Sequence, residues 1–351
     1  MSKNKTKVRF SSRPEMLALA ALVLLLIYNL FFTKGFFKIE IMDNHLYGVL
    51  IDIIKRGGPL MFLSMGMTLV IASGGTDISV GSIMAITGSI AATLIGGTVA
   101  GGIHTEANMP MLPAMAIALG VALVCGLWNG FLVAKLGIQP LIVTLMLQVA
   151  GRGIAELITS GFVRNVYYPP FAYFGQGWVI GLPFSIFVVV AVSIVVYLFT
   201  RKTAYGLYLE SAGTNRVTAE FSGINVKAVI WVAYGVSGLM AGIAGLLATS
   251  EIRAAEASTL GLYLELDAIM ACIIGGNSMK GGRFTLSGSL IGAILVQTLT
   301  TTIYMKGVPS ETITVYKAIV LILVCLLQTT DMSKVFNKLR NSTKKTTEVA
   351  S

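Results

Sequence analysis

Three polar side chains recur at intervals of four within one apolar stretch of the sequence. Gln148, Arg152 and Glu156 would lie on the same face of a helix. Polar groups at membrane depth are costly, so they usually face a bundle interior, a partner or a water-filled path. The three residues are therefore candidates for the lining of a hydrophilic path. The alternative is that Arg152 and Glu156 simply neutralise one another.

Two further polar residues interrupt apolar runs. Asp77 ends the sequence Gly-Gly-Thr-Asp, which separates two apolar segments. It could belong to a broken helix that lines the path, or its carboxylate could cap the amino end of the next helix. Asn129 falls within a G-x-x-x-G pattern at 126–130, a spacing typical of close helix packing. The same spacing at 238–242 and 288–292 predicts close packing there as well.

No set of residues suggests catalysis. The 351 residues contain no G-x-S-x-G, no H-E-x-x-H and no phosphate-binding G-x-x-x-x-G-K-[ST] motif. The cysteines stand singly in apolar runs, as packing residues do, and the histidines are isolated in predicted loops: Cys125, Cys272, Cys325, His45 and His104. We therefore expect no catalytic residue, no metal site and no cofactor bound by this chain.

The composition is that of a membrane protein. Hydrophobic residues make up 55% of the chain and charged residues 12%, whereas about a quarter of the residues of soluble domains are charged. The mean hydropathy is +0.81. Because a membrane helix needs about 20 apolar residues, the sequence predicts an all-α, polytopic membrane helix bundle. The apolar segments predict about ten transmembrane helices, at 16–32, 58–72, 80–97, 112–134, 141–157, 183–200, 228–248, 260–274, 286–304 and 313–328.

Basic residues indicate the orientation of the predicted bundle. The formal net charge is +10, but the basic residues gather at the chain ends and in short loops, which indicates membrane topology and not nucleic-acid binding. Ten spans place the N- and C-termini in the cytoplasm, with Lys55 and Arg56 as an exception on the outer side. The predicted domains are a basic tail over 1–15, one transmembrane domain over 16–328 and a second basic tail over 329–351.

A charged stretch near the predicted outer surface could meet a soluble external partner or the substrate. It combines acidic, basic and aromatic side chains: Glu251, Arg253, Tyr263, Glu265 and Asp267. Alternatively, Glu265 and Asp267 begin a helix, where acidic residues at the amino end are stabilising.

The longest polar interruption between apolar segments spans residues 201–227. It reads RKTAYGLYLESAGTNRVTAEFSGINVK and is too polar to be buried in lipid. Breaks at 213–215 and 222–226 predict a helix–turn–helix at the membrane surface, on the cytoplasmic side, where a soluble partner could bind. The alternative is a solvated connector between two spans.

Four ordered motifs make the sequence similar to a known family. They are GGTDISVGSIMAITG at 74–88, GLWNGFLVAKLGIQPLIVTLMLQVAGRGIAELIT at 126–159, the segment at 201–226, and LELDAIMACIIGGNSMKGGR at 264–283. Together they resemble the ribose-type permeases of bacterial sugar ABC importers. Within that family the sequence is most similar to the galactofuranose-importing branch. The resemblance runs from the first predicted span to the last.

This resemblance implies a permease subunit in the bacterial inner membrane that carries a monosaccharide. Its partners would be a separate ABC ATPase subunit that binds ATP, an external substrate-binding protein and a second permease, either a copy or a paralogue. The motif positions of the family's ATPase-contacting segment are Gly206, Gly213, Asn215, Ser222, Gly223 and Ile224. Val217 and Thr218 depart from that motif, because family members usually carry small alanines around these positions.

Two other functions would place different demands on the sequence. A proton-coupled secondary sugar transporter would need an essential acid within the membrane, and Asp77 and Glu156 are the candidates. A membrane enzyme such as a glycosyltransferase would need an acid, base or metal set that the predicted loops lack.

Overall fold

The computed structural model describes residues 15–42, 45–96, 99–100, 103–104, 108–309, 312–319 and 322. The chain divides into two compact units, Met1–Thr298 and Leu299–Ser351. Helix α12 (Leu286–Met305) runs from the first unit into the second, and residues 312–319 of the second unit are also helical. The first unit holds the candidate site.

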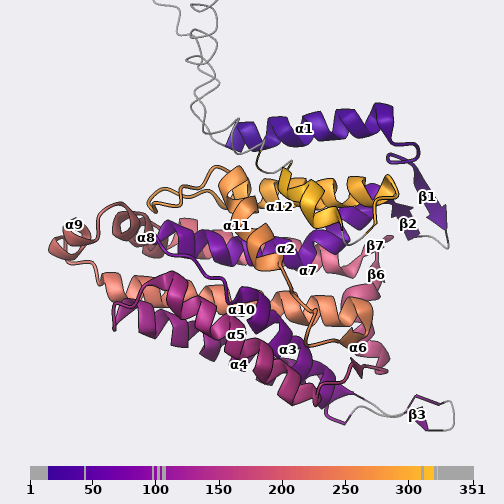
Figure 1. The fold of residues 1–351 in the computed structure, drawn as a ribbon, viewed down its shortest axis with the longest axis horizontal. Helices are drawn as coiled ribbons and strands as arrows, with labels where there is room; N and C mark the ends of the chain where they lie inside the picture. Colours follow the sequence, from indigo (N-terminus) through magenta and orange to yellow (C-terminus); the bar gives the residue numbers. More distant parts are fainter. Residues whose placement is uncertain are drawn as a thin grey trace, which may run out of the picture. The chain divides into compact units, whose positions relative to one another are not determined.

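Helices dominate the described part of the chain (Figure 1). The other long helices are α1 (Glu15–Phe32), α2 (Val49–Ala72), α4 (Met111–Ala134), α5 (Pro140–Thr159), α7 (Phe184–Lys202) and α10 (Val226–Ile252). The shorter ones are α3 (Val80–Ile95), α6 (Pro169–Gln176), α8 (Ala204–Thr214), α9 (Arg216–Phe221) and α11 (Leu264–Ile274).

Short antiparallel strand pairs lie in the connections. The pairs are β1 (Ile39–Met42) with β2 (His45–Gly48), β3 (Val99–Ala100) with β4 (Ile103–His104), β5 (Arg164–Asn165) with β8 (Ala254–Ala255), and β6 (Trp178–Val179) with β7 (Leu182–Pro183). In Figure 1 the helices α8 and α9 lie at one end of α10, and α6, β6 and β7 lie toward the other.

Helix α10 is the central helix of the first unit. Its membrane-length window is 72% buried, against 22% for α4, α5 and α7. Small residues let the neighbouring helices approach it closely: Gly126 of α4 lies against Gly238, and Gly66 of α2 lies against Ser237. A methyl group on any of these glycines would meet atoms of the facing helix.

The close packing predicted from the three G-x-x-x-G patterns is confirmed. Gly130 lies against Trp231 of α10, and Gly242 lies against Ala122 of α4. In α12, Gly288 and Gly292 lie against the backbone of α11 and the residue that follows it. Each pattern therefore marks a helix crossing.

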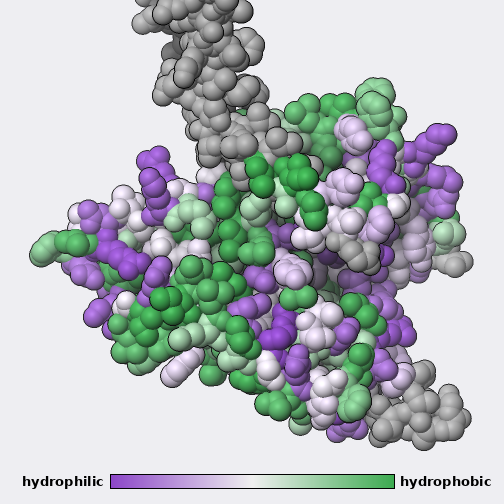
Figure 2. All heavy atoms as spheres, in the orientation of Figure 1, coloured by the Kyte–Doolittle hydropathy of each residue, from purple (hydrophilic) through white to green (hydrophobic). Residues whose placement is uncertain are grey.

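The outer helices present apolar side chains outward. Large residues of α4, α5 and α7 are exposed, among them Leu112, Met146, Val149, Leu157 and Val195. Figure 2 shows hydrophobic residues over α4 and α5, and hydrophilic residues gathered around α8 and α9. Extended exposed apolar surface marks a membrane or protein contact. Six described helices are long and apolar enough to cross a membrane: α1, α4, α5, α7, α10 and α12.

The predicted helical membrane bundle is confirmed as a class, but several boundaries differ. α2 begins at Val49 and not at residue 58, because Asp52, Lys55 and Arg56 form its first turns. α11 has 11 residues, about half of what crosses a bilayer. The strand pairs and α6 were not predicted, since such short elements leave no periodic pattern. The predicted span at 313–328 lies largely outside the described residues.

Candidate functional site

The polar segment at 201–227 folds as two short helices at one end of α10. Asn215 separates them with an extended backbone, φ −157° and ψ 106°. Its side chain accepts a hydrogen bond from the backbone N–H three residues ahead, at 3.1 Å, and caps α9. Asn225 caps α10 through the same contact, also at 3.1 Å. The predicted helix–turn–helix is confirmed, although Gly213 still belongs to α8.

The end of α8 contacts two loops that are distant in sequence. The α-carbon of Gly213 faces the Ala72 carbonyl group and the Gly282 N–H, and a side chain there would collide with both. The Gly282 N–H itself donates to the Ala72 carbonyl at 2.9 Å. Arg216 donates from its guanidinium to the Ser73 carbonyl at 3.3 Å. α8 and α9 are thus joined by backbone contacts to the loops that follow α2 and α11.

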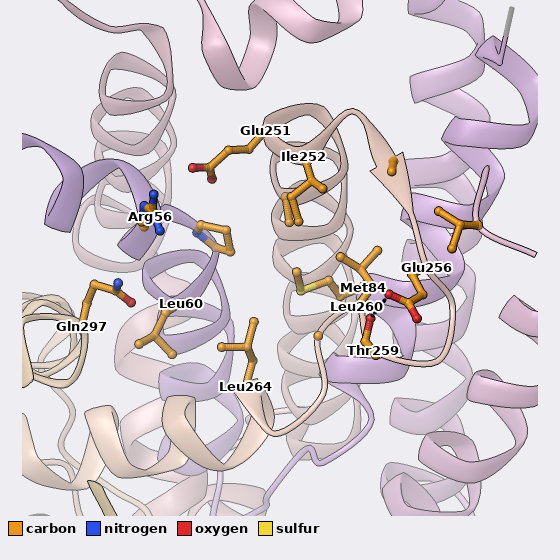
Figure 3. Close-up of a pocket in the computed structure, with 15 residues that line it drawn as sticks. Arg56, Leu60, Met84, Glu251, Ile252, Glu256, Thr259, Leu260, Leu264 and Gln297 are labelled. Carbon is orange, nitrogen blue, oxygen red and sulfur yellow. Dashed lines mark hydrogen bonds between the residues drawn. The ribbon is translucent and has the colours of Figure 1, made fainter. Parts of the chain in front are cut away.

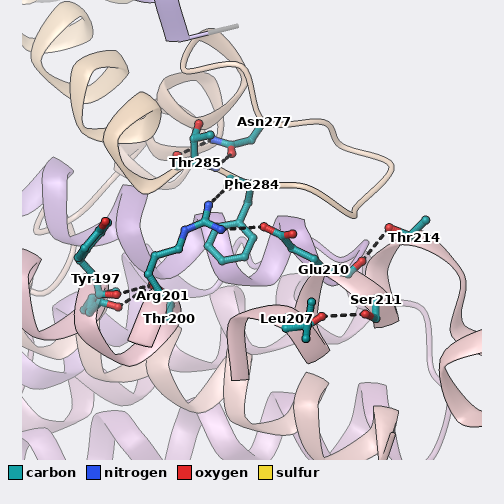
Figure 4. Close-up of polar contacts among 11 residues, drawn as sticks. Tyr197, Thr200, Arg201, Leu207, Glu210, Ser211, Thr214, Asn277, Phe284 and Thr285 are labelled. Atoms are coloured by element: carbon teal, nitrogen blue, oxygen red, sulfur yellow. Dashed lines mark hydrogen bonds and ion pairs between the residues drawn. The ribbon is translucent and has the colours of Figure 1, made fainter. Parts of the chain in front are cut away.

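Arg201 links the last turn of α7 to the same region (Figure 4). Its guanidinium forms an ion pair with Glu210 of α8 at 3.0 Å and donates to the Phe284 carbonyl at 2.5 Å. The guanidinium also lies over the buried Phe284 ring, 4.8 Å from its centroid. Asn277 orders this loop by accepting from the Thr285 N–H at 2.8 Å. One cation therefore connects α7, α8 and the loop after α11.

The first turn of α8 is held against α7 and α10. The Gly206 backbone lies against the Thr200 carbonyl, where a side chain would collide. The Tyr205 hydroxyl donates to the Val229 carbonyl of α10 at 3.1 Å. Burial raises the pKa of this hydroxyl, because the charged form is poorly solvated there. Tyr205 therefore stays protonated and continues to donate at neutral pH.

A groove of about 440 Å³ runs along α8 and α9. Seven of its ten lining residues are polar or charged, and the lining consists of Leu207, Glu210, Ser211, Thr214, Asn215, Thr218, Ala219, Ser222, Ile224 and Arg283. Gly223 takes a φ of +82° in the turn after α9, a conformation that favours glycine. Val217 and Phe221 beside the groove are 61% and 89% exposed. A polar groove with exposed apolar neighbours suits a soluble protein partner.

Asp77 and Asn129 belong to one buried polar cluster. Asp77 accepts from the Ser79 N–H at 3.1 Å, from the Ser79 hydroxyl at 2.6 Å and from the Ser237 hydroxyl of α10 at 2.8 Å. The Asn129 amide donates to the Ser79 hydroxyl at 2.8 Å. The cluster joins the start of α3 to α4 and α10. Asp77 lies two residues before Ser79, the N-cap of α3, and bonds that residue, whose own side chain makes no capping hydrogen bond to α3.

The three residues spaced by four on α5 differ in their exposure and in their hydrogen-bond partners. Gln148 accepts from the backbone of α3 at 3.0 Å and donates to Glu265 at 3.4 Å. Arg152 donates to two carbonyl groups of the segment 257–260, at 2.9 and 2.6 Å. Glu156 is exposed, and within the described residues no ion pair joins it to Arg152. Gln148 and Arg152 therefore connect α5 to the first turn of α11 and to the segment before it.

Comparison with known proteins identifies the family of the chain. A family model described as "Branched-chain amino acid transport system / permease component" matches residues 49–327. The galactofuranose transporter permease protein YtfT of Escherichia coli K12 is 42% identical and is aligned over 92% of each chain. The ribose import permease protein RbsC of the same organism is 32% identical over 89% of this chain and 93% of its own. The chain belongs to the ribose-type permease family of ABC importers.

Other relatives of the permease also have transport names. The fructose import permease protein FruF of Bifidobacterium longum is 36% identical over 89% of the permease and 86% of its own length. No solved structure matches the permease. The resemblance found from four sequence motifs is confirmed, and the permease is a multi-pass protein of the inner membrane. Six helices in its described part are long and apolar enough to span that membrane.

The predicted outer residues of the permease separate into two groups. Glu251 is half-buried at the end of α10, and Arg253 and Tyr263 are exposed, each with a positive φ, 58° and 66°. Glu265 and Asp267 are only 5% and 9% exposed, in the first turn of α11. These two carboxylates therefore match the helix-start alternative and form no exposed face on this chain.

Some contacts of the site could not be found from sequence. Asn277 is buried and also donates to the Ser289 hydroxyl at 2.7 Å; a polar residue among the glycines of GGNSMKGG is a weak signal of such an ordered loop. Arg201 and Glu210 are nine residues apart in adjoining helices, a spacing that no single-helix pattern predicts. The tertiary contact alone reveals this ion pair.

Proposed function

We propose that the permease is the membrane subunit of an ABC importer that carries a monosaccharide, galactofuranose or a related sugar, into the cell. The main support is the 42% identity to a galactofuranose transporter permease over 92% of both chains. The fructose and ribose import permeases among the relatives support a monosaccharide as the substrate class. In this role the chain transports without catalysing a reaction of its own.

The proposed topology has ten membrane crossings and cytoplasmic termini. The crossings are α1, α2, α3, α4, α5, α7, α10, α12, the short α11 together with the non-helical segment before it, and the span predicted from sequence at 313–328, most of which lies outside the described residues. This count puts α8 and α9 in the cytoplasm and Glu251 at the outer end. It is supported by the basic residues of the two tails and of 201–227, which accord with the positive-inside rule.

In the proposed assembly, a separate ATPase subunit binds ATP and contacts the groove along α8 and α9. Gly213 and Arg201 would transmit its motion to the ends of α2, α7 and α11, because their contacts are short and involve backbone atoms. A substrate-binding protein would deliver sugar to the outer end. A second permease, a copy or a paralogue, would cover part of the exposed apolar surface.

Co-purification with the cognate ATPase subunit tests the coupling role of the groove. Asn215→Ala removes the α9 cap and a groove residue, whereas Asn225→Ala removes an equivalent cap at 3.1 Å outside the groove lining. We expect Asn215→Ala to reduce recovery of the ATPase and Asn225→Ala to retain it. Equal recovery by both variants and the unaltered chain would contradict the assignment of this groove.

A further inference from the structure

A second cavity, of about 380 Å³, lies at the end of α10 remote from α8 and α9. It is formed by α2, α10, the segment 254–264 and α12 (Figure 3). In Figure 3, Arg56, Glu251 and Gln297 lie on one side, and Glu256 and Thr259 on the other. The volume falls within the roughly 300–1,000 Å³ of small-molecule sites. None of the path candidates selected from the sequence lines this cavity.

Apolar side chains lie between the two polar sides. Leu60 and Met84 are buried; in Figure 3, Met84 and Leu264 lie between the two polar sides, and Leu60 lies below Arg56. A cavity with mostly apolar walls and a few converging polar groups is typical of sites that orient a small ligand. A sugar matches both parts, since its C–H faces pack on apolar side chains and its hydroxyl groups need hydrogen-bond partners.

Acidic and basic side chains lie near one another around the cavity without forming ion pairs in the described part of the chain. Asp52, Lys55 and Arg56 of α2 all act electrostatically on the Glu251 carboxylate of α10. In the described part of the chain, none of these four groups makes an ion pair within 4.0 Å. Of the four, Arg56 and Glu251 line the cavity, and their hydrogen-bonding atoms are therefore available to a ligand there. The cavity also supplies a reason for a basic residue, Arg56, at an outer end, where the positive-inside rule disfavours it.

We propose that this cavity binds the transported monosaccharide inside the permease, an inference that rests on the proposed function. A carboxylate accepts hydrogen bonds from hydroxyl groups, a guanidinium donates them, and an amide does both. Glu251, Arg56 and Gln297 supply one group of each kind. An anionic solute is opposed by Glu251 and Glu256, and a cationic one by Arg56. The set selects a neutral, polyhydroxylated ligand.

Hydrogen bonds from α5 fix the position of the segment 254–264, which forms one wall of the cavity. The Arg152 guanidinium donates to the Ala257 and Leu260 carbonyl groups, at 2.9 and 2.6 Å. Gln148 donates to Glu265, where α11 begins. Thr259 is fixed on the cavity side by donating to Glu256 at 2.9 Å. Arg152 and Gln148 are positioning residues for the cavity, since they keep its wall in place without facing the ligand.

Sugar uptake by the complete importer tests the proposal. Proteoliposomes would contain the permease, its ATPase and its binding protein, with radiolabelled D-galactose, D-ribose and D-fructose as probes. Glu251→Gln and Arg56→Gln should each lower uptake by about tenfold or more, the loss expected for a hydrogen bond to a charged group. The control variants Glu40→Gln and Lys34→Gln change exposed charged residues outside the cavity lining, and should stay within about twofold.

The outcomes separate the two proposals. ATP-driven uptake by the unaltered importer, with both cavity variants equally active, overturns the sugar site and leaves the importer function standing. Absence of ATP-driven uptake of all three sugars by the unaltered importer overturns the proposed function and the inference with it. ATP hydrolysis by the cavity variants should remain near the unaltered rate, which a misfolded permease would not support.

Thiol protection gives a second measurement that does not depend on the folding of Glu251→Gln. Thr259→Cys places a thiol at the cavity, and Ser258→Cys places one on the neighbouring exposed residue outside the lining. Both would be made in a complete importer with Cys125→Ala and Cys325→Ala. The transported sugar should slow maleimide labelling at 259 and leave labelling at 258 unchanged. Equal labelling rates at 259 with and without sugar overturn the proposal.

Discussion

At Gly213, α8 fits against its neighbours only because no side chain is present. Gly213→Ala would push a methyl group into the Ala72 carbonyl and the Gly282 N–H, and overpacking of this kind costs about 1–3 kcal/mol. We expect a lower temperature of thermal unfolding in detergent and reduced ATP-driven uptake. Gly153→Ala is the matched control, since a methyl group there has no atom within 4 Å apart from those of its chain neighbours and its own helix backbone. Equal behaviour of the two variants would refute the close contact.

Asp77 distinguishes an ATP-driven permease from a proton-coupled transporter. Its carboxylate accepts from Ser79 and Ser237, and an asparagine keeps these contacts because the Ser237 hydroxyl can rotate and accept. We therefore expect the double variant Asp77→Asn, Glu156→Gln to retain most ATP-driven sugar uptake. Loss of uptake in a stably folded double variant would instead indicate an essential membrane proton carrier.

Removing the Asp77 side chain altogether should have a different effect. Asp77→Ala leaves the Ser79 N–H and two buried hydroxyl groups without their acceptor. Each unsatisfied buried group costs about 1–3 kcal/mol. We expect the temperature of thermal unfolding to fall well below that of Asp77→Asn. Similar unfolding temperatures for the two variants would show that the cluster adds little to stability.

Among the elements, α7 and α8 depend on Arg201 for their connection to the loop after α11. Arg201→Gln breaks the ion pair with Glu210 and weakens the contact with Phe284. We expect fewer sugar molecules transported per ATP hydrolysed, with an effect that is not additive with Glu210→Gln. The adjacent Lys202→Gln is the control, because Lys202 is exposed and is in no ion pair among the described residues. Unchanged coupling in Arg201→Gln would contradict this role.

The elements also show what sequence patterns can and cannot predict. Apolar length identified the long helices, and the polar segment at 201–227 predicted α8 and α9, because both signals are local. The start of α2 was misplaced because Lys55 and Arg56 look like the end of a membrane segment, whereas they belong to its first turns beside Glu251. The contacts of Gly213 and Arg201 could not be predicted, since their partners lie on loops distant in sequence.

For the molecule as a whole, the proposed topology places Ser222 inside the cell and Ser258 outside. Both residues are exposed, so a cysteine at either position can react with a membrane-impermeant maleimide. In cells whose outer membrane has been removed or permeabilised and whose inner membrane is intact, we expect labelling of Ser258→Cys and none of Ser222→Cys. Inside-out vesicles should reverse the pattern. Labelling of Ser222→Cys in intact cells would overturn the proposed orientation.

Helix α2 connects the two ends of the first unit. Arg56 and Leu60 line the cavity near its start, and Ala72 meets Gly213 at its end. Ala72 follows Arg56 by 16 residues, which corresponds to about 24 Å along the helix. A displacement of α8 by the ATPase would therefore act on the same helix that lines the proposed sugar site. This connection gives a physical route from ATP hydrolysis to a change in sugar access.

The most direct test of this account is sugar uptake into vesicles that contain the permease with and without its partners. Radiolabelled sugar should enter only when the permease, the ATPase subunit, the binding protein and ATP are all present, and omission of any one should abolish uptake. Uptake by the permease alone, driven by a proton gradient and independent of ATP, would contradict the account.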